Sequence, residues 1–315
     1  MRVVMLSTRD YAGSGGRIRE AVNGSGRHEV FLVTATGHQY GYTVDGCLDT
    51  GDTLAIRQAI RRCDVIHFKG DNPPVKVWRG IPLPDRPVVV TVGGSAFRRL
   101  PGKTCRVAMG LYPLSDYVNL ADIRTALTPD LNYPAYHGTY TQHCINAEAA
   151  PYTWKRGRAF IVGHSPSARR KKGTDALIIA VEKLKEEGVN VRLDIIENVT
   201  NSECVERKKR HTVFFDQVAD TGFYGMSAVE AMQFGVPVMA YVSEMALQQS
   251  DGKLSHVPVI NCGKTPQGIY KLLKYYIDNR KELETLSVVT KWWADKFHGF
   301  TTSAKMWNEI YDKLT

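Results

Sequence analysis

The chain has 315 residues, of which 43% are hydrophobic and 23% are charged. That length accommodates two domains with separate cores, and no apolar run approaches the roughly 18 residues that a membrane-spanning helix needs. The formal net charge of +9 favours a polyanionic partner, namely nucleic acid, an acidic lipid surface or a nucleotide substrate, and does not choose among them.

The first half of the chain predicts a parallel sheet. Apolar strands are predicted at residues 1–7, 28–35, 64–70 and 86–94, with a helix at 54–63. Strands that alternate with helices indicate a parallel sheet covered on both faces, in which ligands bind beyond the carboxyl ends of the strands. The strand ends at Lys69-Gly70 and Gly93-Gly94 are therefore candidate site positions.

A glycine-containing loop, RDYAGSGGR, connects the first strand to the start of a helix. A strand, a glycine loop and a helix resemble a phosphate-binding unit, because a helix N-terminus attracts anions, although the spacing is not that of dinucleotide-binding proteins. A surface turn is the alternative interpretation.

A basic segment follows the fourth predicted strand and contains Phe97, Arg98, Arg99, Lys103 and Arg106. Arginine forks pair with phosphate oxygens and Phe can cover a base or a sugar, so the segment predicts an acceptor-side surface for phosphates. A solvated loop is the alternative. Residues 107–157 are rich in Tyr, Pro and His, and they predict two or three further strands and a linker.

The second half predicts another series of strands and helices. A strand at 159–165 precedes a helix that Thr174 and Asp175 are expected to cap and Gly188 to end. Strands at 189–196 and 211–217 flank a charged helix at 202–210. The ERKKR run of that helix predicts an exposed face.

The segment TGFYGMSAVEAMQFGVPV, residues 221–238, predicts a glycine turn, a helix that Gly235 ends, and a strand. A helix that starts on a glycine turn suits a phosphate group. Glu230 lies about a turn and a half into this helix. Because a carboxylate repels phosphate, we expect Glu230 to accept hydrogen bonds from ribose hydroxyls. The alternative is an ordinary glycine-capped helix of an α/β domain.

The EAMxxGxPV pattern after this glycine-aromatic turn resembles the nucleotide-sugar segment of glycosyltransferase family 4, which contains retaining enzymes of the GT-B fold. The GFYG form resembles a subgroup of short bacterial members. The segment HSPSxRxxKGTD is similar to the family's diphosphate element, and Arg169 and Lys172 match the cations that hold the donor there. A first Glu usually stands eight residues before the second in this family, but Gly222 occupies that position here, which leaves the donor sugar open.

The resemblance implies an α/β protein of GT-B fold, with two Rossmann-like domains facing a cleft. The expected domains are residues 1–152 on the acceptor side and 153–290 on the nucleotide-sugar side. A C-terminal helix within 291–315 is expected to cross back to the first domain, and the aromatic residues suited to that junction are Trp292, Trp293, Trp307 and Tyr311.

The resemblance also implies site residues. Arg169 and Lys172 would be the catalytic cations, because cleavage of the sugar–diphosphate bond leaves growing negative charge on the phosphates. The acceptor-side positions would be Gly94, Arg98 and Arg99. The donor-binding positions would be Gly15, Gly16, Glu197, Tyr224, Gly225, Met226 and Glu230.

The reaction expected from the resemblance moves a sugar from a nucleotide-diphosphate sugar, with UDP favoured, to an acceptor hydroxyl with retention. In front-face displacement the departing phosphate takes the acceptor proton. The sequence has no Asp-x-Asp pair and no clustered Cys or His ligands, so we expect no metal and no cofactor besides the nucleotide-sugar co-substrate.

The location expected from the sequence is the cytoplasm of a bacterial or phage-infected cell. The six cysteines lack CxxC spacing, which indicates reduced thiols. The first apolar run is too short for a signal peptide. Peripheral contact with the inner membrane is compatible with the basic charge.

Three functional interpretations remain open. The acceptor is a glycan, a lipid-linked intermediate or a small molecule in the first. In the second, the protein glycosylates hydroxymethylated bases of DNA, as phage enzymes of GT-B fold do, with a base flipped out of the duplex. In the third, the protein is a catalytically idle GT-B module that binds nucleic acid or another partner. Gly222 keeps the third interpretation open, while Arg169, Lys172 and Glu230 argue against it.

Overall fold

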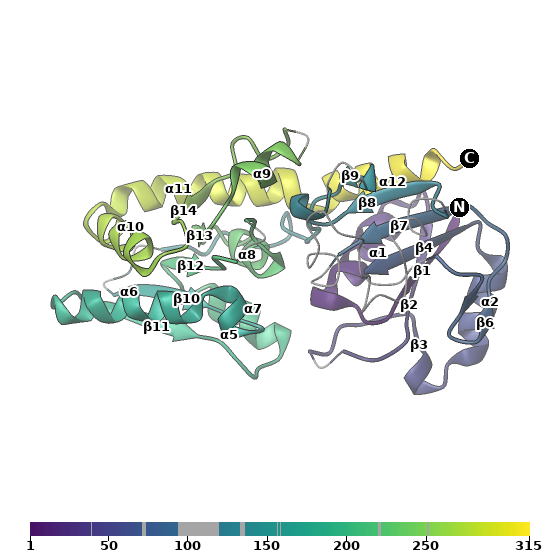
Figure 1. Cartoon of the computed structure of the whole chain (residues 1–315), viewed down its shortest axis with the longest axis horizontal. Helices are drawn as coiled ribbons and strands as arrows, with labels where there is room; N and C mark the ends of the chain where they lie inside the picture. The colour runs from purple at the N-terminus through teal and green to yellow at the C-terminus, as the bar shows by residue number, and fades with distance from the viewer. Residues whose placement is uncertain are drawn as a thin grey trace. The chain divides into compact units, whose positions relative to one another are not determined.

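The structure is a computed structural model that describes residues 1–38, 40–70, 74–93, 120–132, 136–155, 157, 159–219, 222–250 and 252–315. It contains two compact units, Met1–Cys144 with Phe300–Thr315, and Ile145–Gly299. Each unit is built on a parallel sheet with helices packed against it (Figure 1). The functional boundaries expected after residues 152 and 290 stay predictions.

The sheet of the first unit has seven parallel strands in the order β3-β2-β1-β4-β7-β8-β9. Its central strands are buried on both faces, which explains why they are continuous hydrophobic runs in the sequence. A separate antiparallel pair consists of β5 (Val77–Trp78) and β6 (Ile81–Pro82). The strands of the large sheet are β1 (Arg2–Ser7), β2 (Glu29–Thr34), β3 (Gly46–Cys47), β4 (Val65–Gly70), β7 (Val88–Val92), β8 (Ile123–Ala126) and β9 (Thr139–Tyr140).

The C-terminal helix packs on the first unit, as predicted. In α12 (Phe300–Asp312), Trp307 and Tyr311 are fully buried in a core that includes α1 and one face of the sheet. The Tyr311 hydroxyl lies 2.9 Å from Nδ1 of His67 in β4. Trp292 and Trp293 belong instead to the second unit, where Trp292 is exposed, so these two residues do not join α12 in its contact with the sheet. The other helices of the unit are η1 (Tyr11–Gly13), α1 (Ser14–Ser25), η2 (Leu48–Thr50), α2 (Thr53–Arg62) and η3 (Pro129–Leu131).

The sheet of the second unit has five parallel strands in the order β11-β10-β12-β13-β14. They are β10 (Phe160–His164), β11 (Val191–Ile195), β12 (Val213–Phe215), β13 (Val238–Ala240) and β14 (Val259–Asn261). The chain leaves β10 toward β11 on one side and returns to β12 on the other. The strand order therefore reverses between β10 and β12, which is where open α/β sheets bind ligands.

The helices of the second unit follow the predicted order. Around the sheet, α6 packs against α10, and α7 packs against α8. The helices are α5 (Arg169–Lys172), α6 (Thr174–Glu186), α7 (Asn201–Lys208), α8 (Met226–Met232), α9 (Glu244–Gln248), α10 (Pro266–Asp278), α11 (Arg280–Trp293) and the π-helical η5 (Ala294–His298).

Two local predictions for these helices differ from the structure. The N-cap of α6 is Gly173, and no side chain caps the helix, because the Thr174 hydroxyl donates instead to Nε2 of His164 at 2.8 Å. The ERKKR face is not wholly exposed, since Lys208 within it is fully buried. The predicted end of α6 is confirmed: Gly188 has a φ of 76° and its N–H donates to the Lys185 carbonyl.

Candidate functional site

The predicted donor residues of the second unit lie at the carboxyl edge of its sheet. The loop after β10 leads through Ser165 into α5, and the loop after β12 leads from Asp216 toward α8. These are the two strands between which the strand order reverses. The side chains that meet there are therefore positioned by the topology of the sheet.

Lys172 reaches across this switch point. Its Nζ lies 3.4 Å from Asp216 Oδ1 and 2.5 Å from Gln217 Oε1, and 17% of its side chain is exposed. The other Asp216 oxygen accepts the Gly225 N–H at 2.6 Å. Asp216 thus joins the end of α5 to the turn before α8, and Lys172 presents a partly accessible ammonium group at this junction.

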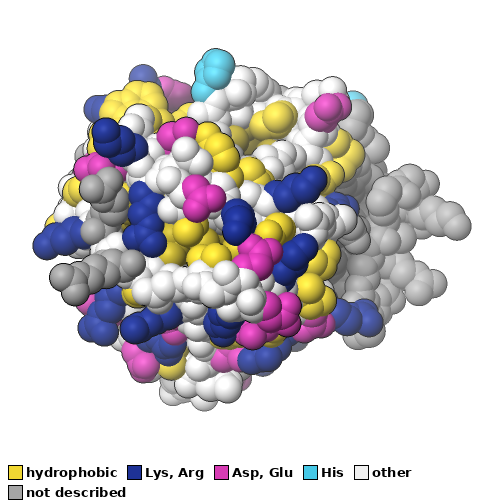
Figure 2. Space-filling view, turned by 90° about the vertical axis from the view of Figure 1, so that its left-hand side faces the viewer, with side chains coloured by type: hydrophobic (Ala, Val, Ile, Leu, Met, Phe, Trp, Pro, Cys, Tyr) yellow, Lys and Arg dark blue, Asp and Glu magenta, His cyan; other side chains and the backbone are white. Residues whose placement is uncertain are grey.

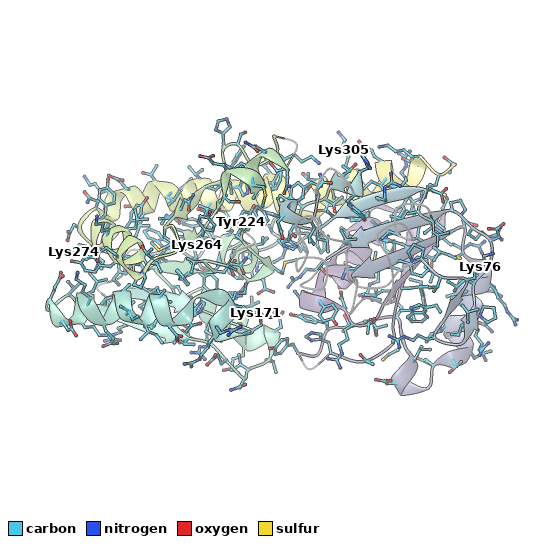
Figure 3. All side chains as sticks on the ribbon, in the orientation of Figure 1. Lys76, Lys171, Tyr224, Lys264, Lys274 and Lys305 are labelled. Atoms are coloured by element: carbon cyan, nitrogen blue, oxygen red, sulfur yellow. The ribbon has the colours of Figure 1, made fainter. Side chains whose placement is uncertain are left out.

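Arg169 stands at the opposite end of α5 and pairs with Glu197. Its Nε lies 3.0 Å from Glu197 Oε1, and its terminal nitrogen lies 2.6 Å from Oε2. The hydrogen bond from Arg169 lowers the pKa of Glu197. Arg170 and Lys171 are exposed, as predicted for solvated neighbours, and Figure 3 labels Lys171 on α5.

Glu230 is buried and faces α7. Its Oε2 lies 2.6 Å from the Lys208 ammonium, and its Oε1 accepts a hydrogen bond from Asn201 at 3.0 Å. The exposed fractions of the two charged side chains are 0% for Lys208 and 5% for Glu230. The carboxylate therefore has a fixed orientation, set by two residues of α7.

A chain of hydroxyl groups connects this buried pair to the switch point. Lys208 also donates to the Ser227 hydroxyl at 2.8 Å, and Ser227 lies 2.5 Å from the hydroxyl of Ser165. Both serines are partly exposed. The network consequently runs from a polar, accessible surface after β10 to the buried carboxylate of Glu230.

The turn before α8 is held from within the unit. The Tyr224 side chain, which is labelled in Figure 3, is fully buried. Its hydroxyl lies 2.9 Å from His298 Nε2. Burial also raises the pKa of Tyr224. Met226 is buried as well. The predicted donor contacts at these two positions are therefore restricted mainly to the backbone.

Gly222 has a φ of 57°, and a Cβ built on it would lie 2.2 Å from the Ser243 hydroxyl. Its carbonyl accepts the Ser243 N–H at 2.9 Å. The local structure therefore disfavours a glutamate at this position, where the resembled family usually has its first Glu.

The glycine loop of the first unit leads into a helix, as the sequence predicted. Gly15 and Gly16 lie within the first turn of α1, and their N–H groups donate to the two carboxylate oxygens of Asp10 at 2.6 and 2.9 Å. Lys69 Nζ lies 3.2 Å from Asp10 Oδ1, and both side chains are buried. The chain's own carboxylate occupies the anion position at this helix N-terminus. The donor contact expected at Gly15 and Gly16 stays a prediction.

The acceptor-side residues Gly94, Arg98 and Arg99 lie outside the described residues, as do Lys103 and Arg106. Elsewhere, charged groups of both signs are mixed: on the face drawn in Figure 2, Lys and Arg side chains are interspersed with Asp and Glu.

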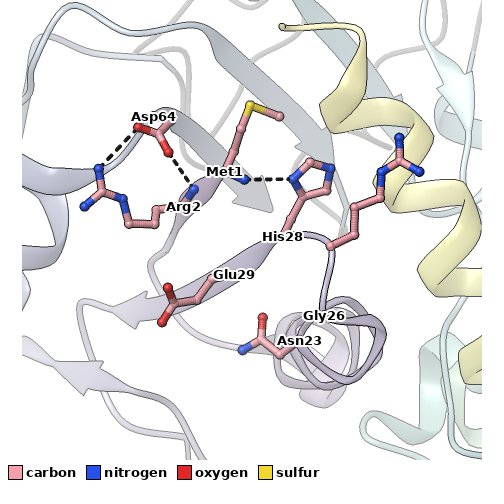
Figure 4. A pocket seen from close by; sticks show the side chains of 8 residues that line it. Met1, Arg2, Asn23, Gly26, His28, Glu29 and Asp64 are labelled. Carbon is pink, nitrogen blue, oxygen red and sulfur yellow. Dashed lines mark hydrogen bonds and ion pairs between the residues drawn. The ribbon is translucent and has the colours of Figure 1, made fainter.

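A polar concavity lies in the first unit, at the amino edge of its sheet. It has a volume of about 570 Å³ and is lined by residues that include Arg2, His28 and Asp64 (Figure 4). Arg2 pairs with Asp64 at 3.4 Å, and the N-terminal ammonium group lies 3.1 Å from His28. This edge is opposite to the carboxyl ends at which parallel sheets bind ligands.

Among the residues that the structure describes, no group of three or more His, Cys, Asp or Glu side chains could hold a metal ion. No helix in the same part of the chain is long and apolar enough to cross a membrane.

The sequence did not identify the connecting residues of the site. Lys208 lies in a run of charged residues, and only its tertiary neighbours distinguish it from the half-buried Lys209 beside it. Ser165 and Ser227 are not marked as site residues by any motif in the sequence analysis. Asp216 lies within the strand predicted at 211–217, but its link between Lys172 and Gly225 depends on tertiary packing.

No protein-family model matches the chain, and no curated protein matches it. Solved structures of similar fold exist. The Anabaena protein HepE in complex with UDP is 13% identical, with full coverage of both chains and a TM-score of 0.66. An alpha-glucosyltransferase in complex with UDP and a 13-mer DNA is also 13% identical, covers 100% of this chain and 99% of its own, and has a TM-score of 0.66.

A glycosyltransferase from Rickettsia africae is 8% identical, covers 99% of this chain and 98% of its own, and has a TM-score of 0.64. At these identities the comparison establishes the fold. The chain has the GT-B fold, with two Rossmann-like sheets, as the sequence predicted.

Proposed function

We propose that this protein is a glycosyltransferase that moves a sugar from a UDP-linked donor to an acceptor hydroxyl, with retention and without a metal ion. The observation that carries the proposal is the meeting of Lys172, Asp216 and Gly225 at the switch point of the second sheet. A ligand in that position would lie beside the Lys172 ammonium group and the Asp216 carboxylate, which accepts hydrogen bonds from Lys172 at the end of α5 and from the Gly225 N–H before α8. Two structures of similar fold were solved with bound UDP, which supports a nucleotide as the ligand of this protein as well.

In this proposal Arg169 and Lys172 hold the donor diphosphate. Arg169 is 52% exposed on its side chain, and solvent screening leaves an exposed ion pair such as that with Glu197 little effect on stability. A diphosphate can therefore replace Glu197 as the partner of the guanidinium group. Both cations would stabilise the charge that develops on the leaving phosphate, which also takes the acceptor proton.

Glu230 would accept hydrogen bonds from the ribose hydroxyls, and the backbone at Gly225 would border the phosphates. Gly222 removes the carboxylate that touches the donor sugar in the resembled family. The sugar must therefore be recognised by other groups, and the donor can differ from that of the family's ordinary members.

The decisive experiment measures UDP binding by calorimetry and then turnover of UDP-sugars, first without an acceptor and then with glycans, lipid-linked sugars and hydroxymethylated DNA. Lys172→Ala should lower turnover about 100-fold or more if about 3 kcal/mol of transition-state stabilisation is lost. Lys171→Ala is the matched control, because it removes an adjacent exposed lysine. Near-parental turnover in folded Lys172→Ala would refute the assignment. UDP binding without donor hydrolysis or transfer would favour the idle binding module.

DNA is the second candidate acceptor. The net charge of +9 and the sequence pI of about 9.2 favour a polyanion, and one structure of similar fold contains DNA. Transfer to hydroxymethylated DNA, with affinity that falls steeply as salt increases, would support this candidate over a glycan or lipid acceptor. The same assay at two salt concentrations distinguishes a DNA substrate from a small neutral acceptor.

A further inference from the structure

We propose that Lys208 is a positioning residue that fixes Glu230 for recognition of the nucleotide ribose and thereby sets a preference for ribonucleotides over deoxyribonucleotides. The inference rests on the proposed function and extends it to a residue that contacts no ligand. Lys208 is fully buried at the end of α7, whereas the other charged residues of this helix are largely accessible.

The Lys208 ammonium group has three neighbours within the unit. It lies 2.6 Å from Glu230 Oε2 and 2.8 Å from the Ser227 hydroxyl, and it sits 5.1 Å from the centre of the Phe214 ring. Glu230 lies about one helical turn after Ser227 in α8. One ammonium group therefore fixes two successive positions on the same face of α8.

Asn201 completes the orientation of the carboxylate. Its side-chain amide donates to Glu230 Oε1 at 3.0 Å, whereas Lys208 binds Oε2. Both residues belong to α7, so the two oxygens of Glu230 are held from one side. A carboxylate has about four acceptor positions, and a fixed plane presents them to hydroxyl donors in a defined direction.

A gain in folding stability does not by itself explain the buried ion pair between Lys208 and Glu230. Replacement of a buried ion pair by well-packed apolar side chains is often neutral or stabilising, whereas removal of one partner is strongly destabilising. The pair between Lys208 and Glu230 is buried on both sides, with exposed fractions of 0% and 5%. Lys208 gains a function if the Glu230 carboxylate accepts hydrogen bonds from hydroxyl groups, because the ammonium group then balances and orients a carboxylate that binds the ligand.

The link to Ser165 places the network at the ligand-binding edge. Ser227 lies 2.5 Å from Ser165, which directly follows β10 at the switch point. Glu230 is thus coupled to the loop that leads to Arg169 and Lys172. The diphosphate and ribose contacts would be set at a fixed spacing by hydrogen bonds within one unit.

The test compares the affinities of UDP and 2′,3′-dideoxy-UDP, by calorimetry, in the parent protein and in variants. The parent should prefer UDP by about tenfold or more, the loss expected when a charged acceptor is left without its hydroxyl donors. Lys208→Met should reduce that preference to within about threefold, while affinity for inorganic pyrophosphate, which lacks a ribose, should stay within about twofold of the parent.

Lys209→Met is the matched control. Lys209 is the next residue, and its ammonium group pairs with Glu206, whose side chain is 63% exposed. This variant should keep the parental preference for UDP. A purely structural role of Lys208 would weaken UDP, dideoxy-UDP and pyrophosphate together, so the ratio of affinities separates positioning from general destabilisation.

Lys208→Gln serves as the second variant if Lys208→Met does not fold, because the amide keeps a hydrogen-bond donor beside the carboxylate. It should show a reduced preference for UDP. A folded Lys208 variant with the parental ratio would overturn the inference and leave the proposed function standing. A parent that binds both nucleotides equally would overturn the inference together with the ribose contact of Glu230, and would leave the proposed sugar transfer standing. A parent that binds no UDP would refute both.

Discussion

Replacement of Gly222 by alanine tests why this chain lacks the first glutamate of the resembled family. The residue has a φ of 57°, a left-handed conformation that costs a residue with a Cβ about 1–2 kcal/mol. The added Cβ would also lie 2.2 Å from Ser243 Oγ and 2.6 Å from Ser243 Cβ. Ser243 cannot move freely, because its hydroxyl caps α9 by accepting the Ala246 N–H at 3.1 Å.

The steric conflict adds about 1–3 kcal/mol, as overpacking does in protein cores. Gly222→Ala should therefore lower the free energy of unfolding of the second unit by about 2–5 kcal/mol. Gly252→Ala is the control, since Gly252 has a φ of 74° and nothing lies within 4 Å of its Cβ position. That variant bears only the conformational cost, about 1–2 kcal/mol.

Urea denaturation of both variants, followed by circular dichroism, measures the difference. If Gly222→Ala is no more destabilising than Gly252→Ala, the contact with Ser243 does not restrict the position. A glutamate at 222 should fold less well than alanine, because its longer side chain starts from the same Cβ. Donor binding that improved in Gly222→Glu would contradict this reasoning.

Three further predictions concern charge. Burial lowers the pKa of His164 to about 4, so the unfolded state binds more protons than the folded state between about pH 6.5 and 4. The free energy of unfolding should therefore fall by up to about 3 kcal/mol as the pH drops through that range. In urea titrations, the His164→Gln variant should show a flatter dependence of this free energy on pH. Arg169→Ala should leave the free energy of unfolding close to that of the parent yet weaken UDP binding about tenfold in calorimetry, and equal UDP affinity would remove Arg169 from the site. Sugar transfer should persist in excess EDTA, whereas strict dependence on manganese or magnesium would show a metal-assisted leaving group.

The fold was predictable because its signals are local and repeated. Strands such as β1 and β4 are apolar throughout, since both faces of a parallel sheet are buried. The glycine after α6 ends that helix as expected. The cap of α6 was mispredicted because Thr174 satisfies the buried His164, a partner ten positions earlier in the chain that pattern alone does not reveal.

The site was predictable only where residues stand in a motif. Arg169 and Lys172 lie near the predicted ligand edge, but the sequence does not show that one of them pairs with Glu197 and the other with Asp216. Lys208 could not be predicted as a site residue, because a run of charged residues predicts a solvated face. Its burial depends on the packing of α7 against α8. Interactions between distant segments decide such roles.

Replacement of Asp10 by alanine tests whether the chain itself supplies the anion at the glycine loop of the first unit. Its carboxylate accepts the N–H groups of Gly15 and Gly16 and pairs with Lys69, so it fills the anion position at the start of α1. Asp10→Ala should destabilise the first unit by about 3–5 kcal/mol, because it leaves a buried lysine without this partner.

Formate has the size and charge of the deleted group, and it should restore much of the loss by binding the two amides and Lys69. Thermal unfolding with increasing sodium formate should raise the midpoint of Asp10→Ala well above any change in the parent, with sodium chloride at equal ionic strength as the control. Equal shifts in both proteins would show that this helix N-terminus holds no anion. Selective rescue would show that the chain supplies its own anion there, which leaves the cations of the second unit to hold the donor phosphates.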